Sequence, residues 1–190
     1  MKIILMRHGR PVIDLEVMKN LRKSPAEVGQ MVDDYLDVEL DKIQNVPEIS
    51  LQAAKPCNVV FSSDLRRALT SLEWLNKPSN TRGDACFREI RMPYLTWSNP
   101  KLRFNIWHIL FWLTWFIGFA RNGDSIKPAR RRAAQGADIL AGAALQDEAV
   151  LLLGHAILNW LIATELKKLG WRRVRSTGYS YWSFIEMEKF

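Results

Sequence analysis

Cysteine is scarce in this chain: Cys57 and Cys86 are the only two among 190 residues. Because they lack metal-ligand spacing and are too few for a disulfide framework, the sequence argues against a disulfide-stapled or cysteine-ligated metal protein. It favours a reducing, cytoplasmic setting. A signal peptide is also missing, since the apolar stretch 3–6 is short and Arg7 follows it at once. We therefore expect a cytoplasmic protein, with membrane association left open by one apolar segment near residue 110.

Internal repeats, low-complexity tracts and Gly/Ser linkers are absent as well, so we expect a single domain over residues 1–190. The net charge of +7 favours an anionic partner, which is a phosphorylated molecule, a nucleic acid or an acidic membrane surface. The basic clusters at 130–132 and 172–175 show no repeated interleaving with aromatic residues. Because single-stranded nucleic-acid sites use such aromatics, no nucleic-acid partner is expected.

Short apolar runs alternate with helical patterns along the chain, which predicts an α/β layer fold with a mostly parallel sheet. One helix begins with a capping box formed by Ser24 and Glu27. The predicted strands are 2–6, 57–63, 85–88, 149–154 and 181–189, the last expected at an edge. The predicted helices are 24–40, 64–75 and 156–169.

Cation-forming side chains follow three of the predicted strands. The first strand ends in Arg7 and His8, the second is followed by Arg67 in the first helical turn, and the 149–154 strand is followed by His155. Because the carboxyl ends of parallel strands share one edge of a sheet, these side chains are expected to converge there. Helix N-termini at the same edge add positive potential. The sequence therefore predicts a phosphate-binding site at this edge.

The segments LMRHG, FSSDLRRALTS and LLLGHA resemble, in this order, the signatures of the histidine phosphatase superfamily, branch 1, whose members are phosphoglycerate mutase-like. The second segment matches the family pattern with Arg67 rather than Arg66. FREI resembles the segment that supplies an acidic proton donor and points to Glu89. More weakly, NGDS at 122–125 resembles the start of a late family helix. The resemblance implies a three-layer sandwich with a mostly parallel central sheet flanked by helices.

The resemblance implies a metal-independent phosphatase that hydrolyses a phosphomonoester through a phosphohistidine on His8. Arg7, Arg67 and His155 would bind the phosphoryl oxygens, with His155 also counted among the catalytic residues, and Glu89 would be the general acid. No metal and no cofactor are implied, because arginines supply the positive charge. Further candidate substrate contacts are Arg10, Asp14 and Ser63.

Two residues depart from the family pattern. Pro11 stands where many relatives carry a small hydroxyl residue, and Asp14 stands where an asparagine is expected. A carboxylate at position 14 repels phosphate unless it turns away or pairs with an arginine such as Arg10, so these residues raise the question of weakened activity. The chain is also short for a glycolytic mutase, which favours hydrolysis. The alternatives are phosphoglycerate mutase-type transfer and a non-catalytic phosphate-binding or membrane-docked module.

Residues 104–120, FNIWHILFWLTWFIGFA, contain no charged side chain. They lie within an expected apolar cap or insert at about 97–121, placed over the site by the resemblance. A helix here would be apolar on all sides and therefore buried or in contact with lipid. Three interpretations remain open: a buried helix, hairpin or subunit contact; a lid that accepts a small phosphorylated substrate with an apolar moiety; and peripheral membrane contact through 104–120. The oligomeric state is left open with them.

Overall fold

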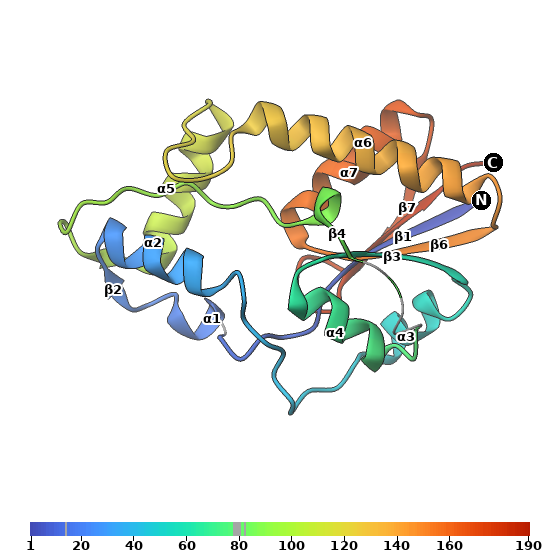
Figure 1. Ribbon diagram of the computed structural model, residues 1–190, viewed down its shortest axis with the longest axis horizontal. Helices are drawn as coiled ribbons and strands as arrows, with labels where there is room; N and C mark the ends of the chain where they lie inside the picture. Colours follow the sequence, from blue (N-terminus) through green and yellow to red (C-terminus); the bar gives the residue numbers. More distant parts are fainter. Residues whose placement is uncertain (14, 78–80, 82) are drawn as a thin grey trace.

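The computed structural model describes residues 1–13, 15–77, 81 and 83–190 (Figure 1). The strands are β1 (Lys2–Arg7), β2 (Arg22–Lys23), β3 (Val59–Ser63), β4 (Gly83–Asp84), β5 (Leu102–Arg103), β6 (Ala149–Gly154), β7 (Arg172–Ser176) and β8 (Phe184–Glu188). The helices are α1 (Leu15–Met18), α2 (Pro25–Asp34), α3 (Glu48–Ala54), α4 (Arg66–Trp74), the 3₁₀ turn η1 (Ala85–Phe87), α5 (Phe104–Phe116), α6 (Ile126–Ala144) and α7 (Ala156–Lys168).

The main sheet has the strand order β4-β3-β6-β1-β8-β7. Its first four strands run parallel. On the other side of β1, β8 pairs antiparallel with β1, and β7 pairs antiparallel with β8. In the β1–β6 register Arg7 lies opposite Gly154, and the His8 N–H donates to the Gly154 carbonyl over 3.0 Å. The residues that follow these two strands are thereby placed side by side, as expected for a parallel pair.

Two apolar cores lie on opposite faces of the sheet, because successive residues of a strand point to opposite sides. Ile3 and Leu5 of β1 pack in the core under α6 and α7, whereas Ile4 and Met6 pack in the core with α3 and α4. Figure 1 shows these helix pairs above and below the strands. The predicted three-layer, mostly parallel sandwich is therefore confirmed.

A cap of smaller elements stands at the carboxyl ends of the parallel strands (Figure 1). It consists of α1, α2, α5 and the two-stranded β2–β5 ribbon. Val28 of α2 and Phe104, Trp107 and Phe111 of α5 form a third apolar cluster that holds the cap together. Five of the predicted site residues line the space between cap and sheet edge.

Several predicted elements need correction. Residues 85–88 form no strand, because the Asp84 carboxylate accepts from the Cys86 N–H over 2.7 Å and so caps the η1 turn. The helix begun by the Ser24–Glu27 capping box ends at Asp34 rather than near 40. The last strand, β8, is not at an edge, since it lies between β1 and β7. Neither β7 nor most of α6 was predicted from the sequence.

Both cysteines are buried. In the described part of the chain no helix combines the length and apolarity needed to cross a membrane.

Candidate active site

A cavity of about 590 Å³ opens between the carboxyl edge of the sheet and the cap. It brings together five of the predicted site residues, namely Arg7, His8, Arg67, Glu89 and His155. They come from β1, the turn after β1, α4, the segment after η1 and the residue that begins α7. Because they are separated by up to 148 positions in sequence (7 to 155), only the fold can assemble them.

His8 is buried and held in one orientation at the end of β1. Its Nδ1 lies 2.6 Å from the Gly9 carbonyl oxygen. Because a carbonyl oxygen can accept a hydrogen bond but cannot donate one, Nδ1 carries the ring hydrogen. The lone pair is therefore on Nε2, which accepts from Arg67 Nε over 3.2 Å. Burial lowers the pKa of His8 well below its ordinary value, and the Arg67 and Arg7 cations lower it further. A neutral imidazole with a directed lone pair results.

The position after His8 has room only for a glycine. A Cβ at this position would lie 2.5 Å from the Trp182 ring, and the Gly9 N–H donates to Ser71 Oγ over 2.9 Å. The close approach of Trp182 leaves no room for a side chain, so the backbone that holds His8 is fixed by packing on both sides.

Arg67 is almost completely buried in the first turn of α4. Its Nη1 donates to the carbonyl oxygens of Tyr35 and Leu36 over 2.8 and 2.9 Å, and its guanidinium lies 4.7 Å from the centre of the Tyr35 ring. These contacts fix the plane of the guanidinium against His8. They also give a hydrogen-bond partner to the carbonyls of Tyr35 and Leu36, the two residues that follow the end of α2 at Asp34.

His155 is fully buried at the N-terminus of α7, with its ring centre 5.0 Å from that of His8. Neither ring nitrogen has a hydrogen-bond partner within the described ranges. Burial and the neighbouring His8, Arg67 and Arg7 lower the pKa of His155 well below its ordinary value. Because buried polar groups are rarely left unpaired, these nitrogens point to a ligand that enters the cavity.

Glu89 is fixed by backbone N–H groups of the same helix end and by that of the residue that follows Glu89. Its Oε1 accepts from Ile90 N and Leu158 N over 2.9 and 3.1 Å, and its Oε2 accepts from Ile157 N over 3.4 Å. Burial raises the pKa of Glu89 above its ordinary value, although these hydrogen bonds and Arg7 oppose the shift. A phosphate dianion beside it would raise this pKa further, since like charges favour the protonated acid.

Tyrosines that sequence reasoning did not single out complete the cavity. The Arg7 guanidinium lies 4.2 Å from the centre of the Tyr181 ring and donates to the Tyr179 carbonyl. The Tyr181 ring is in turn 5.8 Å from His8. Tyr35 supports Arg67 in the same way. The cluster of aromatic and small residues at 178–183, between two strands, was the one sequence signal for this wall.

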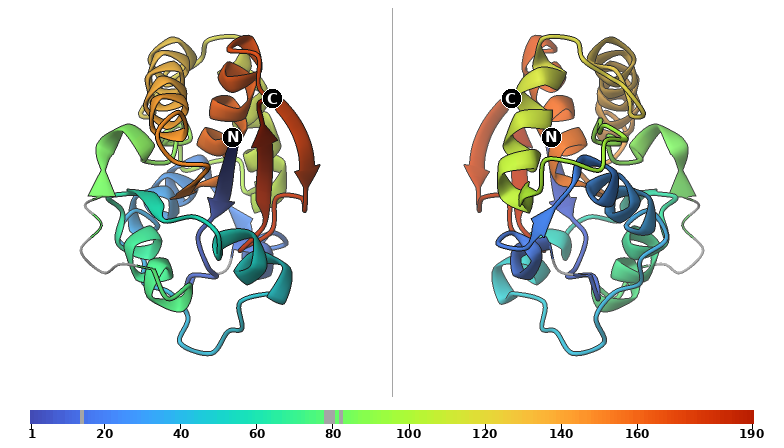
Figure 2. Two further views of the ribbon diagram at one scale, coloured as in Figure 1. Left: turned by 90° about the vertical axis from the view of Figure 1, so that its right-hand side faces the viewer. Right: turned by 90° about the vertical axis from the view of Figure 1, so that its left-hand side faces the viewer.

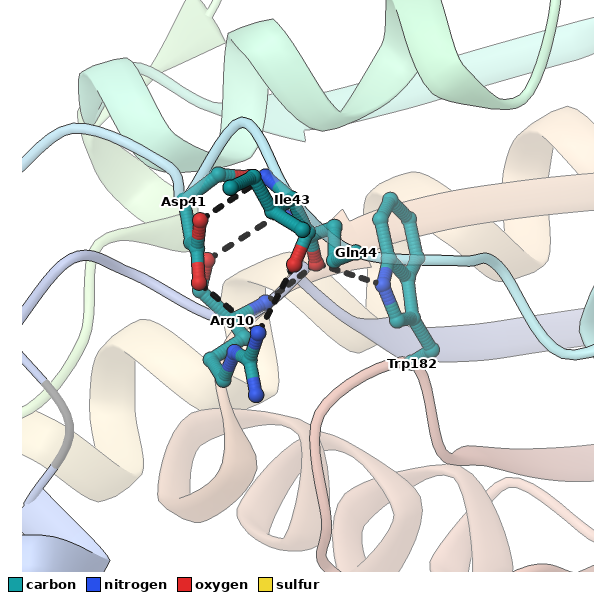
Figure 3. Close-up of polar contacts among 5 residues, drawn as sticks. All are labelled: Arg10, Asp41, Ile43, Gln44 and Trp182. Carbon is teal, nitrogen blue, oxygen red and sulfur yellow. Dashed lines mark hydrogen bonds and ion pairs between the residues drawn. The ribbon is translucent and has the colours of Figure 1, made fainter.

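The additional substrate contacts predicted from the sequence are placed differently. The Arg10 guanidinium does not line the cavity: it donates to Asp41 over 2.7 Å and to the Ile43 carbonyl over 2.8 Å (Figure 3). Gln44 Oε1 accepts from the Arg10 N–H and from Trp182 Nε1, which ties this cluster to the loop before β8. Ser63 is buried and its Oγ accepts from the Leu65 N–H over 3.2 Å, away from the cavity. Asp14 lies outside the described residues.

The apolar segment forms α5, which supplies one wall of the cavity. Phe104, Asn105, His108 and Trp112 line it, and all four lie on one side of the helix at spacings of one to four residues. The same cavity is lined by Met31 and Val32 of α2 and by Met92, which lies in the segment between η1 and β5. The cavity thus has a charged corner at the sheet edge and a largely apolar wall beneath the cap.

No group of three or more metal-type side chains is assembled among the residues that the structure describes.

The cavity therefore holds a buried imidazole pair, two arginines and a fixed carboxyl group on the carboxyl edge of a mostly parallel sheet. The sequence profile described as "Histidine phosphatase superfamily (branch 1)" matches residues 48–189. The chain therefore belongs to the histidine phosphatase superfamily, branch 1. The matched range begins after Arg7 and His8, so the structure, not the profile, places these two residues in the site.

Solved structures with the same fold are distant in sequence. A mycobacterial glucosyl-3-phosphoglycerate phosphatase is 20% identical, with a TM-score of 0.54 and coverage of 88% of this chain and 79% of that one. A phosphoserine phosphatase mutant from Entamoeba histolytica, solved with phosphoserine, is 21% identical, with a TM-score of 0.55 and coverage of 88% and 80%. A phosphoglycerate mutase from Thermus thermophilus is 20% identical, with a TM-score of 0.50 and coverage of 85% and 81%. Among curated protein sequences none matches.

Proposed function

We propose that this protein is a metal-independent phosphatase that hydrolyses a phosphomonoester through a phosphohistidine on His8. The observation that carries the proposal is the arrangement of the two imidazoles. His8 Nε2 lies in a cavity corner lined by Arg7, Arg67 and His155, and its lone pair becomes available for attack when Arg67 Nε exchanges its contact with Nε2 for a phosphoryl oxygen. Membership of a superfamily with phosphatases and a mutase among its structural neighbours supports the same class of reaction.

In the first step His8 Nε2 attacks phosphorus while the bond from phosphorus to the ester oxygen breaks. The leaving alkoxide takes the proton of Glu89, so an alcohol departs and a phosphoramidate remains. The positive charge on the substituted imidazole is stabilised by the Nδ1–H bond to the Gly9 carbonyl, 2.6 Å away. Arg7, Arg67 and His155 bind the equatorial oxygens, where preorganised donors contribute about 3–4 kcal/mol each to the transition state.

In the second step Glu89, now a carboxylate, takes a proton from water as the water oxygen attacks phosphorus. The bond between phosphorus and Nε2 breaks, inorganic phosphate leaves, and both His8 and the protonated Glu89 are restored. Because Glu89 is fixed by two backbone N–H groups at the start of α7 and by the Ile90 N–H, the same carboxyl group remains in place for both steps.

The alcohol part of the substrate is proposed to carry an apolar moiety. The wall beyond the charged corner is built largely from α2, α5 and Met92, with Val32, Phe104 and Trp112 among its residues. An alkyl or aryl group placed against this wall removes apolar surface from water, which stabilises binding by about 25 cal/mol per Å².

The proposal is tested by phosphate release from three monoesters in the presence of EDTA: an aryl phosphate, octyl phosphate and glycerol phosphate. We expect turnover of the aryl and octyl esters with kcat/KM at least about tenfold above that of glycerol phosphate, because only these bury an apolar group. Equal rates for octyl and glycerol phosphate would contradict the apolar moiety. An isomerised ester in place of free phosphate would favour mutase-type transfer, and no turnover of any ester would favour a non-catalytic phosphate-binding module.

A second test concerns the proton that Glu89 supplies. We expect Glu89→Gln to lower kcat/KM for octyl phosphate by about 10²- to 10³-fold but that for nitrophenyl phosphate much less, since a nitrophenolate leaves without protonation. In the wild type the octyl rate falls as pH rises through the raised pKa of Glu89, and falls at low pH where His8 becomes protonated. The alkaline fall disappears in the variant. Equal losses on both esters would contradict the assignment.

A further inference from the structure

The outer face of α5 is apolar and uncovered. Its exposed residues are Ile106, Ile109, Leu110, Leu113, Phe116 and, just after the helix, Ile117. They recur at intervals of one, three and four residues, which places them on one side of a helix. Leu113 is 60% exposed and Ile117 is 85% exposed. In the right-hand view of Figure 2, α5 is at the front and no helix or strand lies over it.

The other sides of α5 are already occupied. Trp107, Phe111 and Trp115 are buried against the protein, and His108 and Trp112 face the cavity. This accounts for a helix that is apolar on all sides: one side packs, one lines the site, and the third faces outward. On that third side, Phe116 packs partly against Trp115 and Trp160, with ring centres 5.1 and 6.2 Å away. By contrast, Ile109, Leu113 and Ile117 are more than half exposed. A contiguous apolar patch of this kind marks an interaction surface.

Positive charge surrounds this face. The stretch 90–123 contains no acidic residue, and it includes exposed Arg103 and Arg121 at the two ends of α5. The Phe104 N–H at the start of α5 donates a hydrogen bond to the Leu21 carbonyl over 2.8 Å. This contact places Leu21 and Arg22, both exposed, beside the start of α5. An apolar strip flanked by cations complements an anionic bilayer surface.

We propose that the outer face of α5 docks the protein on an anionic membrane surface. The helix has 13 residues and is about 20 Å long. It therefore lies in the plane of the interface, with its outer side chains among the acyl chains and the arginines at the level of the lipid headgroups. This inference does not rest on the proposed phosphatase activity, because it concerns a face that points away from the cavity.

The test is co-flotation of the protein with vesicles of phosphatidylcholine containing phosphatidylglycerol. We expect the wild type to float with these vesicles, and to float less with pure phosphatidylcholine or at high salt. The double variant Ile109→Gln/Leu113→Gln weakens partitioning by about tenfold or more, since both side chains are exposed and would be buried in lipid. Arg103→Gln/Arg121→Gln weakens it by about tenfold on anionic vesicles only.

Leu145→Gln is the matched control, because Leu145 is 75% exposed but follows the far end of α6. It should float like the wild type, and so should His8→Ala, since docking does not need turnover. The proposal is overturned if the wild type fails to float, if Leu145→Gln loses as much as the α5 variant, or if neutral and anionic vesicles bind equally. It is also overturned if sedimentation shows a dimer that Ile109→Gln/Leu113→Gln converts to a monomer, which would assign the face to a second copy.

Discussion

His8→Ala is expected to abolish phosphate release from every monoester, with a loss of about 10⁴-fold or more, as for nucleophiles in other covalent enzymes. The physical reason is that the Nδ1–H bond of His8 to the Gly9 carbonyl fixes the lone pair on Nε2, whereas the second neutral imidazole, His155, has no such orienting bond among the described residues. The two arginines of the site are cations, and Glu89 is committed to the leaving group. The wild type mixed with a ³²P-labelled monoester and quenched in base should carry acid-labile radioactivity, because a phosphoramidate survives base but not acid. The alanine variant should carry none.

His108→Ala is the matched control for that loss. It removes the one of the three histidines that lines the cavity on α5, whereas His8 and His155 lie at the sheet edge. The label should still appear on His8 in this variant, whatever the change in substrate affinity. Radioactivity on His8→Ala would mean that a different residue is the nucleophile.

Arg67→Lys is expected to lower kcat/KM by about 10²- to 10³-fold, the effect of removing one preorganised donor from a phosphoryl site. Lysine keeps the charge but cannot reproduce the fork that bonds the carbonyls of Tyr35 and Leu36 while its Nε faces His8. Because these carbonyls lose their partner, the free energy of unfolding should fall by about 1–3 kcal/mol as well. Steady-state kinetics and thermal unfolding measure the two effects separately.

Arg66→Lys provides the comparison from the neighbouring position. The Arg66 side chain is 68% exposed and pairs with Glu39 at the surface, a contact worth about 1 kcal/mol or less. Its kinetics and stability should stay close to wild type. If both substitutions reduced turnover alike, substrate binding would depend on the overall positive charge of this region. The specific role assigned to Arg67 would then be wrong.

The sequence predicted those parts of the fold that have a local cause. Buried strands such as β1 and β6 are continuous apolar runs, and the Ser24–Glu27 capping box marks the start of α2 without help from other elements. By contrast, all five residues of β7 are exposed, so it has no burial pattern and exists because β8 offers a partner. The residues that follow α2 likewise have a distant partner, since Tyr35 and Leu36 accept from Arg67.

The candidate site divides in the same way. Arg7, His8, Arg67 and His155 follow strands in the chain, so the topology of a parallel sheet is enough to place them together. The supporting tyrosines come from loops that have no such rule. Arg10 was a candidate substrate contact, but Asp41, thirty-one positions away, holds its guanidinium. Contacts between two loops depend on the whole fold and leave no pattern in either segment.

The burial of both cysteines makes the chain convenient for single-site chemical labelling. Burial raises the pKa of the Cys57 thiol to about 11, and burial also raises that of Cys86. Because the thiolate is the form that reacts with alkylating reagents, both native thiols are nearly inert at neutral pH. A cysteine introduced on the outer face of α5 would therefore take a fluorophore alone, without removal of either native residue, and would report directly on the surroundings of that helix.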